Sequence, residues 1–179
     1  PRTWYDESKR LGETLCWVYS EYFGVHASVV RPFNVYGPGM MPTDYRVLPN
    51  FAWSIAKGKE ISIYGDGNQT RTFCYVTDAI VGFLKVLVES PHPDVYNVGN
   101  PHPEISMNDL ANLVGKLTGN HPQIRHIPHP ESYPADEPMR RCPDVERISS
   151  RLEYEALVGL EEGLQRFFSW SESYYQKLD

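Results

Sequence analysis

The order of helix-like and strand-like segments constrains the fold of this chain more than any other feature. Apolar residues that recur every three or four positions predict helices, and short β-branched or aromatic runs bounded by turn residues predict strands. The predicted helices cover residues 3–23, 47–57, 78–89, 107–118, 145–152 and 160–178, and the predicted strands cover 26–31, 60–64, 70–76, 95–98 and 123–127. Helices that alternate with short strands in this way are typical of an α/β fold.

Individual residues set the limits and the buried faces of several predicted helices. Gly24 ends the first helix, and Ser106 with Asp109 three residues later predicts an N-cap of the capping-box type. The stretch 128–143 is rich in proline, and no regular structure is predicted there. In helix 78–89 one apolar stripe is predicted to be buried, formed by Ile80, Val81, Leu84, Leu87 and Val88.

Charge and hydropathy exclude several classes of partner. The chain has 179 residues, the length of one ordinary domain, and a net charge of −6. It contains no basic cluster, so a nucleic-acid partner is not expected. No apolar run approaches the ~20 residues of a membrane span, and no signal peptide is visible. Three cysteines without metal-type pairing suit free thiols in a reducing cytosol, so we predict a cytoplasmic protein.

Three histidines and an acidic residue raise the question of a metal site. His121, His126 and His129 precede Glu131, but they extend over a predicted strand and a proline-rich loop. That arrangement does not place the ligands on one helical face, and no further acid or cysteine completes a tetrahedral set. The sequence therefore predicts no metal site.

The first predicted helix carries a tyrosine and a lysine four positions apart, Tyr5 and Lys9. Residues at this spacing lie one above the other on the same helix face. An ammonium group close to a phenol favours the phenolate, which makes the tyrosine a better base for a sugar hydroxyl. A Y-x-x-x-K match alone is common by chance, so its meaning depends on the residues downstream of it.

Five sequence blocks come after this pair in a fixed order. They read RPFNVYGP (31–38), YGDGNQTRTF (64–73), YVTD (75–78), YNVGN (96–100) and RCPD (141–144). In this order they resemble the C-terminal part of the extended short-chain dehydrogenase/reductase family, the NAD-dependent nucleotide-sugar epimerases, dehydratases and decarboxylases. The resemblance implies an α/β fold: the C-terminal remainder of a Rossmann-type NAD-binding domain plus a small α/β substrate-binding domain.

Within that family the chain is most similar to the UDP-glucuronate decarboxylases. The likeness is carried by YDESKR at 5–10, YGDGNQTRTFCYV at 64–76 and DEPMRRCPDV at 136–145. Three residues depart from the pattern of that subgroup: Ser8 replaces a glycine, Gly39 an arginine and Tyr154 a tryptophan. A UDP-sugar 4-epimerase of the same family therefore stays an alternative.

The resemblance implies a catalytic role for the first helix. Tyr5 would take the proton of the C4 hydroxyl, and Lys9 would orient the ribose hydroxyls of NAD; Tyr5, Lys9 and Pro32 would contact the cofactor. The resulting 4-keto-uronic acid can lose carbon dioxide, and return of the hydride then gives a pentose. An epimerase instead rotates the keto-sugar and reduces its other face.

The resemblance also implies a set of substrate-binding residues. Arg71 and Arg141 would bind the diphosphate, Arg141 also the sugar carboxylate, because a guanidinium fork matches such oxygens. Asn34 would contact the sugar or its phosphate, and Leu48 and Tyr64 would flank the uracil. Plain structural roles stay open for all of them: a turn for Asn34, solvated surface positions for the arginines, and core packing for Leu48 and Tyr64.

The family's glycine-rich turn, which binds the dinucleotide pyrophosphate, has no counterpart in this sequence. The chain is therefore expected to be the back half of a longer enzyme and to bind NAD poorly on its own. The alternative is a non-catalytic nucleotide-sugar-binding fragment. We assign residues 1–38 to the end of the NAD-binding domain. Residues 39–179 are assigned mainly to the substrate-binding domain, with segments that return to the first layer.

The first helix also carries a candidate dimer face. Family members commonly dimerise through a four-helix bundle that includes the tyrosine-bearing helix. We therefore expect a homodimer, whose contact face on that helix would be formed by Trp4, Leu11, Leu15, Tyr19 and Tyr22.

Overall fold

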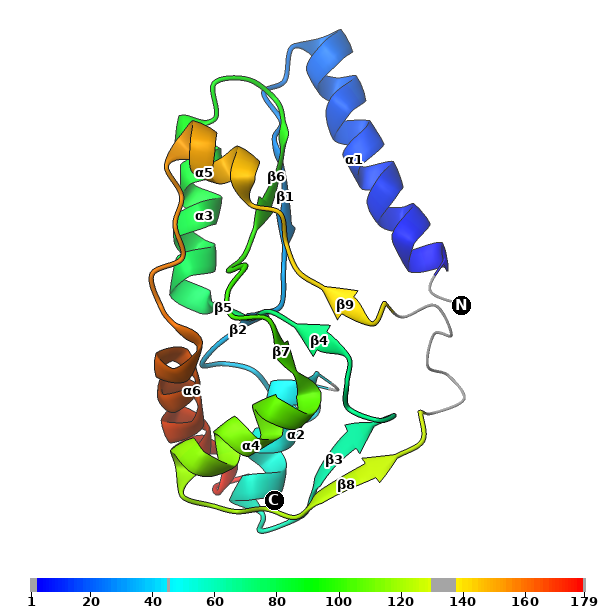
Figure 1. Ribbon diagram of the computed structural model, residues 1–179. Coiled ribbons are helices and arrows are strands. Elements are labelled where there is room, and N and C mark those ends of the chain that lie inside the picture. Colours follow the sequence, from blue (N-terminus) through cyan, green and yellow to red (C-terminus); the bar gives the residue numbers. More distant parts are fainter. Residues whose placement is uncertain (1–2, 45, 130–137, 179) are drawn as a thin grey trace.

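The computed structural model describes residues 3–44, 46–129 and 138–178. The helices are α1 (Thr3–Phe23), α2 (Val47–Ala56), α3 (Val76–Glu89), α4 (Met107–Thr118), α5 (Glu146–Leu152) and α6 (Leu160–Tyr175). The strands are β1 (Val29–Pro32), β2 (Val35–Tyr36), β3 (Ile61–Tyr64), β4 (Thr70–Arg71), β5 (Cys74–Tyr75), β6 (Val95–Val98), β7 (Ile105–Ser106), β8 (Ile124–Ile127) and β9 (Arg140–Arg141). The predicted α/β class is confirmed (Figure 1).

Several elements form where local signals predict them. Helix α1 and strand β6 have the predicted bounds. Ser106 caps α4: its Oγ accepts a hydrogen bond from the Asp109 N–H at 3.0 Å and donates to the Asp109 carboxylate at 2.6 Å. Gly119 ends the same helix in the left-handed conformation, with φ of 67°. Helix α4 thus has a side-chain cap at its N-terminus and a left-handed glycine at its C-terminus, the usual capping residues of a helix.

The single strand predicted at 70–76 is wrong. The segment forms two separate strands, β4 and β5, and Val76 already begins α3. Its β-branched and aromatic residues favour a strand locally, but long-range pairing decides: β4 lies between β7 and β9, whereas β5 pairs with β2. The proline-rich stretch also contains a short strand that was not predicted, β9.

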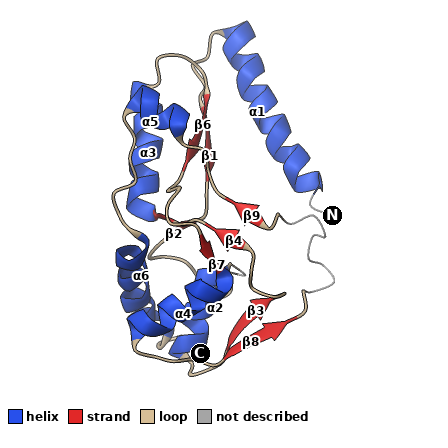
Figure 2. Cartoon of the chain, viewed as in Figure 1, coloured by secondary structure: helices blue, strands red, loops and turns tan. Residues whose placement is uncertain are grey.

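The strands form small sheets with mostly parallel pairing. The pairs β1–β6, β2–β5 and β3–β8 are parallel. Strand β4 is the centre of a three-stranded sheet, antiparallel to β7 and parallel to β9. Figure 2 shows this sheet between the β1–β6 pair and the β3–β8 pair. Parallel pairs joined through helices are the pattern of Rossmann-type sheets.

The structure has two hydrophobic cores, one on each side of the three-stranded sheet β7–β4–β9. The first, which we call the sheet core, packs α3 and α5 on strand β6 and includes Tyr96, Val98 and Ile148. The second, the helical core, joins α2, α4 and α6 to β3 and includes Leu48, Phe51 and Phe167. Strand β6, on which α3 and α5 pack, pairs with β1, while the division of the chain into two domains at residue 38, with later segments in the first layer, stays a prediction.

Helix α1 lies apart from both cores, with no buried side chain (Figure 1). Arg31 of β1 donates to Glu13 through Nε at 2.6 Å, and the Val25 N–H donates to the Tyr19 carbonyl at 3.2 Å. Trp4 and Tyr22 are 78% and 77% exposed. The Arg31–Glu13 contact thus ties the middle of the helix to β1, and the Val25 contact closes its C-terminal end.

The buried stripe predicted for α3 is wrong. Leu87 and Val88 are 79% and 77% exposed, and Ile80, Val81 and Leu84 are about half exposed as well. The buried face carries small residues instead, Ala79, Gly82 and Val86. A Cβ on Gly82 would lie 2.6 Å from Val98 Cγ1, so the missing side chain lets α3 lie close against β6. The helix is apolar on nearly all sides, and periodicity alone could not select the inner face.

Gly163 is required by close packing at the start of α6. A Cβ there would overlap the Tyr36 hydroxyl and lie 3.1 Å from Tyr75 Cδ2. Gly163→Ala is therefore expected to lower the free energy of unfolding by about 1–3 kcal/mol, measured by urea denaturation. Gly12→Ala, in α1, is the matched control. A Cβ added at Gly12 would have no neighbouring atom within 4 Å, and alanine favours a helix. Equal unfolding midpoints for the two variants would contradict this packing argument.

The three cysteines differ in environment. Cys74 is fully buried in the sheet core, where burial raises the pKa of its thiol to about 11. Cys16 on α1 and Cys142 after β9 are partly exposed, and all three are free thiols. None of the helices in the described ranges is long and apolar enough to cross a membrane.

Candidate functional site

The pairing of β4 with β9 brings the two predicted diphosphate ligands together. Arg71 and Arg141 are direct partners in the parallel register, although they are far apart in the sequence. Neighbouring partners in a parallel pair present their side chains on the same face. Arg71 is only 9% exposed, and its Nη1 donates to the carbonyls of Thr70 and Met139 at 2.8 and 3.1 Å. The β4–β9 pair thus places two arginines side by side, and Arg71 is the more buried of the two.

Asn34 joins the same region from the end of β1. Its Nδ2 donates to the Thr72 carbonyl at 2.7 Å, and the Cys74 N–H donates to the Asn34 carbonyl at 3.2 Å. Its backbone is in the left-handed region, with φ of 44°, which asparagine tolerates better than most residues. Asn34 therefore has the predicted turn role and also lies against the segment that follows Arg71. Its contact with the sugar stays a prediction.

The predicted catalytic pair lies on α1. Tyr5 is 54% exposed, and the Lys9 ammonium lies over its ring, 5.3 Å from the centroid. Both side chains are on one face, as the spacing predicts. Pro32 is exposed at the carboxyl end of β1, the end at which open α/β sheets bind ligands. The roles of these three residues in catalysis and NAD binding stay predictions.

The two residues predicted to flank uracil lie in different environments. Leu48 is 1% exposed within the helical core, so its side chain packs as core. Tyr64 is 37% exposed on β3 and stacks on His129, with ring centroids 5.8 Å apart and planes at 21°. Tyr64 thus retains an accessible ring, whereas Leu48 has little surface for a base.

Two of the three histidines considered for a metal site, His126 and His129, contact other protein side chains. His126 Nε2 lies 2.9 Å from the Asn108 side-chain oxygen, and His129 stacks on Tyr64. Glu131 lies outside the described residues. Among the residues described, no group of three or more His, Cys, Asp and Glu side chains is placed to hold a metal.

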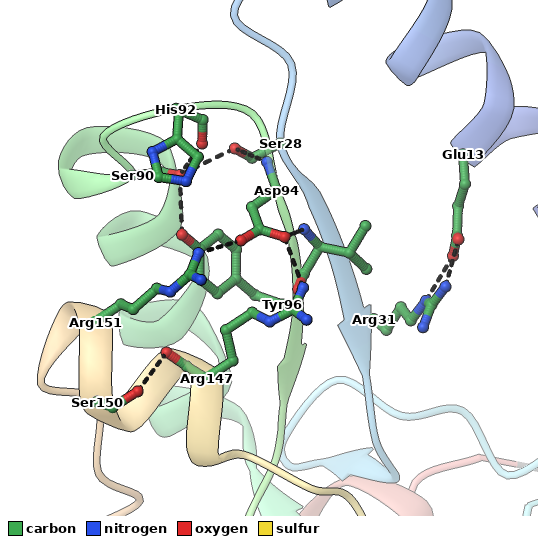
Figure 3. A network of polar contacts seen from close by, with 11 residues as sticks. Glu13, Ser28, Arg31, Ser90, His92, Asp94, Tyr96, Arg147, Ser150 and Arg151 are labelled. Atoms are coloured by element: carbon green, nitrogen blue, oxygen red, sulfur yellow. Dashed lines mark hydrogen bonds and ion pairs between the residues drawn. The ribbon is translucent and has the colours of Figure 1, made fainter.

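A polar cavity of about 380 Å³ lies beside β6 and α5, and the residues that line it do not include Arg71 or Arg141. Its arginines are already matched by carboxylates: Arg147 donates to Asp94 at 2.6 Å, Arg151 pairs with the same group, and Arg31 pairs with Glu13 (Figure 3). Burial opposes ionisation of Asp94, but the Val95 N–H and the two arginines hold its pKa below the usual value. We therefore assign this network to fixing α5 on β6, not to anion binding.

Sequence reasoning missed one polar cluster next to the arginine pair. Glu104 accepts hydrogen bonds from Thr70 Oγ1 and from Arg140 Nε, the latter at 2.9 Å to Oε2. The three residues are separated by 34 or more positions along the chain. No local pattern connects them, and only the strand pairing reveals the contact.

The strand pairs, the tyrosine–lysine helix and the arginine-bearing sheet edge define a protein of the Rossmann-type α/β class. The model of the NAD dependent epimerase/dehydratase family matches residues 1–99, more than half of the chain. The chain belongs to this family.

The chain is similar to UDP-glucuronic acid decarboxylases in sequence and to a UDP-glucuronic acid 4-epimerase in structure. UDP-glucuronic acid decarboxylase 1 of Xenopus tropicalis is 40% identical over 166 residues, which are 93% of this chain and 38% of that protein. UDP-glucuronic acid decarboxylase 1 of Arabidopsis thaliana is 39% identical, over 94% of this chain and 37% of the relative. A crystal structure of UDP-glucuronic acid 4-epimerase from Bacillus cereus, in complex with UDP-glucuronic acid and NAD, has a TM-score of 0.82 at 29% identity. It is covered over 51% of its length, and this chain over 92%, so the chain spans about half or less of each relative.

Proposed function

We propose that this chain is the C-terminal portion of an NAD-dependent enzyme that decarboxylates UDP-glucuronate. The observation that carries the proposal is the side-by-side placement of Arg71 and Arg141, next to Asn34, in a chain 40% identical to a UDP-glucuronic acid decarboxylase. Two guanidinium groups suit a substrate that carries both a diphosphate and a carboxylate.

The cofactor site would be formed by Tyr5, Lys9 and Pro32. All three side chains are exposed, so a dinucleotide can approach them without disturbing either core. When bound, NAD supplies the acceptor and later the donor of the hydride. Tyr5 takes the proton from the C4 hydroxyl, and Arg141 holds the sugar carboxylate beside the 4-keto group. Carbon dioxide then leaves because the ketone accepts the electron pair of the broken bond, and the resulting enolate takes a proton from water at C5, which restores the 4-ketone. The hydride then returns to C4, and Tyr5 returns its proton to the C4 oxygen.

A UDP-sugar 4-epimerase is the second candidate. It is supported by the likeness to the Bacillus cereus 4-epimerase and by Ser8 and Gly39, which depart from the decarboxylase pattern. Both reactions share the oxidation at C4, and they differ in whether the C5 carboxylate is lost. The third candidate, a fragment that binds nucleotide sugars without catalysis, would need only the paired arginines that are proposed to bind the diphosphate.

One assay separates these candidates. The natural polypeptide that contains this chain is incubated with NAD and UDP-glucuronate, and the products are resolved by mass spectrometry. Carbon dioxide with UDP-pentose supports the decarboxylase, whereas a product isomeric with the substrate supports the epimerase. For the 179-residue chain alone, separate titrations with UDP and with NAD test the fragment alternative. Binding of UDP without NAD supports that alternative, and tight NAD binding contradicts it.

We further propose that α1 forms a homodimer interface. No side chain of α1 is buried, and Trp4, Leu11, Leu15, Tyr19 and Tyr22 are all about half exposed or more. An apolar face of this size usually marks an interaction site. Leu15→Glu is expected to shift the sedimentation coefficient toward that of the monomer. A wild-type protein that stays monomeric at every concentration would contradict the proposal.

A further inference from the structure

The strand that carries Arg141 has little backbone support. Strands β4 and β9 are two residues long, so few ladder hydrogen bonds fix their register. The Thr70 N–H donates to the Met139 carbonyl at 2.8 Å, and Arg71 Nη1 donates to the same oxygen at 3.1 Å. The position of Arg141 therefore depends on side-chain contacts as well as on strand pairing.

One carboxylate, at the start of β7, supplies such contacts to the other two strands of this sheet. Glu104 immediately precedes β7, and its Oε1 accepts a hydrogen bond from Thr70 Oγ1 of β4. Arg140 of β9 reaches both oxygens of Glu104, through Nε at 3.1 and 2.9 Å and through Nη2 at 2.9 Å. The hydroxyl of Thr70, together with the hydrogen bond and charge of Arg140, lowers the pKa of Glu104. The carboxylate is thus ionised at neutral pH and holds β4 and β9 together.

The contact lies on the face opposite the two arginines of the candidate site. Thr70 pairs with Arg140, and Arg71 pairs with Arg141. Because successive side chains in a strand point to opposite faces, Glu104 holds β9 from one face while Arg141 lies on the other. Glu104 can therefore act on Arg141 only through the strand.

We propose that Glu104 is a positioning residue for Arg141. Glu104 holds Arg140 close to Thr70 and thereby keeps β9 in register with β4. In that register Arg71 and Arg141 can bind the same diphosphate. This inference rests on the proposed function, in which these two arginines bind the nucleotide-sugar diphosphate.

A double-mutant cycle tests the inference. UDP affinity is measured by calorimetry in the natural polypeptide that contains this chain, for Glu104→Gln, Arg141→Ala and both together. Glu104→Gln keeps the shape of the side chain and is expected to weaken UDP binding by about two- to fivefold, the upper part of the range for an exposed ion pair. In the Arg141→Ala background it is expected to add no further loss, because both changes act through the same contact. Uridine, which lacks the diphosphate, is expected to bind equally well to wild type and Glu104→Gln.

A matched control separates positioning from general loss of surface charge. Glu60→Gln removes an exposed pairing with Arg125, at 3.9 Å on the β3–β8 pair, and is expected to leave UDP affinity unchanged. Wild-type UDP affinity in Glu104→Gln, or losses that simply add in the double variant, would overturn the positioning role while leaving the site intact. Wild-type UDP affinity in Arg141→Ala would overturn the proposed diphosphate site itself, and with it this inference.

Discussion

Replacing Tyr5 with phenylalanine, in the natural polypeptide that contains this chain, is expected to lower turnover of UDP-glucuronate by about 10²–10⁴-fold. That range is the usual contribution of a positioned general acid or base. Phenylalanine keeps the ring on which the Lys9 ammonium lies, at 5.3 Å from the centroid, and removes only the hydroxyl. Affinity for UDP is therefore expected to stay unchanged, since the residues proposed to bind the diphosphate are on β4 and β9.

The measurement is a steady-state comparison of kcat and of UDP inhibition constants. Tyr174→Phe serves as the matched control, because that partly exposed tyrosine on α6 stacks on Trp170, remote from the candidate site in the sequence and in the fold. Loss of turnover in both variants would point to a general structural effect. Full turnover in Tyr5→Phe would mean that another group takes the proton of the C4 hydroxyl.

Replacing Leu48 with alanine is expected to lower the free energy of unfolding by about 2–5 kcal/mol, as large-to-small changes in cores do. Leu48 is 1% exposed and packs in the helical core with Phe51 and Phe167. The substitution removes buried apolar atoms and leaves a cavity that the surrounding helices fill only in part. Urea denaturation of the 179-residue chain gives the value directly.

The same variant tests the second role predicted for Leu48. Under conditions where Leu48→Ala remains folded, unchanged UDP affinity is expected if the residue serves the core alone. Reduced UDP affinity without reduced affinity for inorganic diphosphate would support a contact with uracil. Leu157→Ala is the control for stability: Leu157 is 77% exposed, so its change is expected to stay within about 0.5 kcal/mol. A similar loss of stability in both variants would contradict the assignment of Leu48 to the core.

Local signals predicted the elements that depend on local chemistry. The cap of α4 by Ser106 requires only a hydroxyl and an N–H three residues later, and both are visible in the sequence. The buried face of α3 could not be predicted in this way, because the helix has apolar residues on nearly all sides. Its inner face was selected by the close approach to β6 that Gly82 permits, which is a property of the packed structure.

The candidate site shows the same division. The blocks around Asn34, Arg71 and Arg141 marked these residues, and the structure places them in one region. The contact between Glu104 and Arg140 was not predicted, because it exists only after β7, β4 and β9 have paired. Leu48 is buried in the helical core, which agrees with the core role left open for it, and its contact with uracil stays a prediction.

The unequal environments of the three thiols have a practical consequence. Reactivity toward alkylating reagents depends on thiolate content and access, so Cys74, buried in the sheet core, stays silent while Cys16 and Cys142 remain addressable. Those two positions fall on the tyrosine helix and directly after the arginine strand. Spectroscopic labels on these two native cysteines would report the distance between the tyrosine helix and the arginine strand while a sugar nucleotide is added.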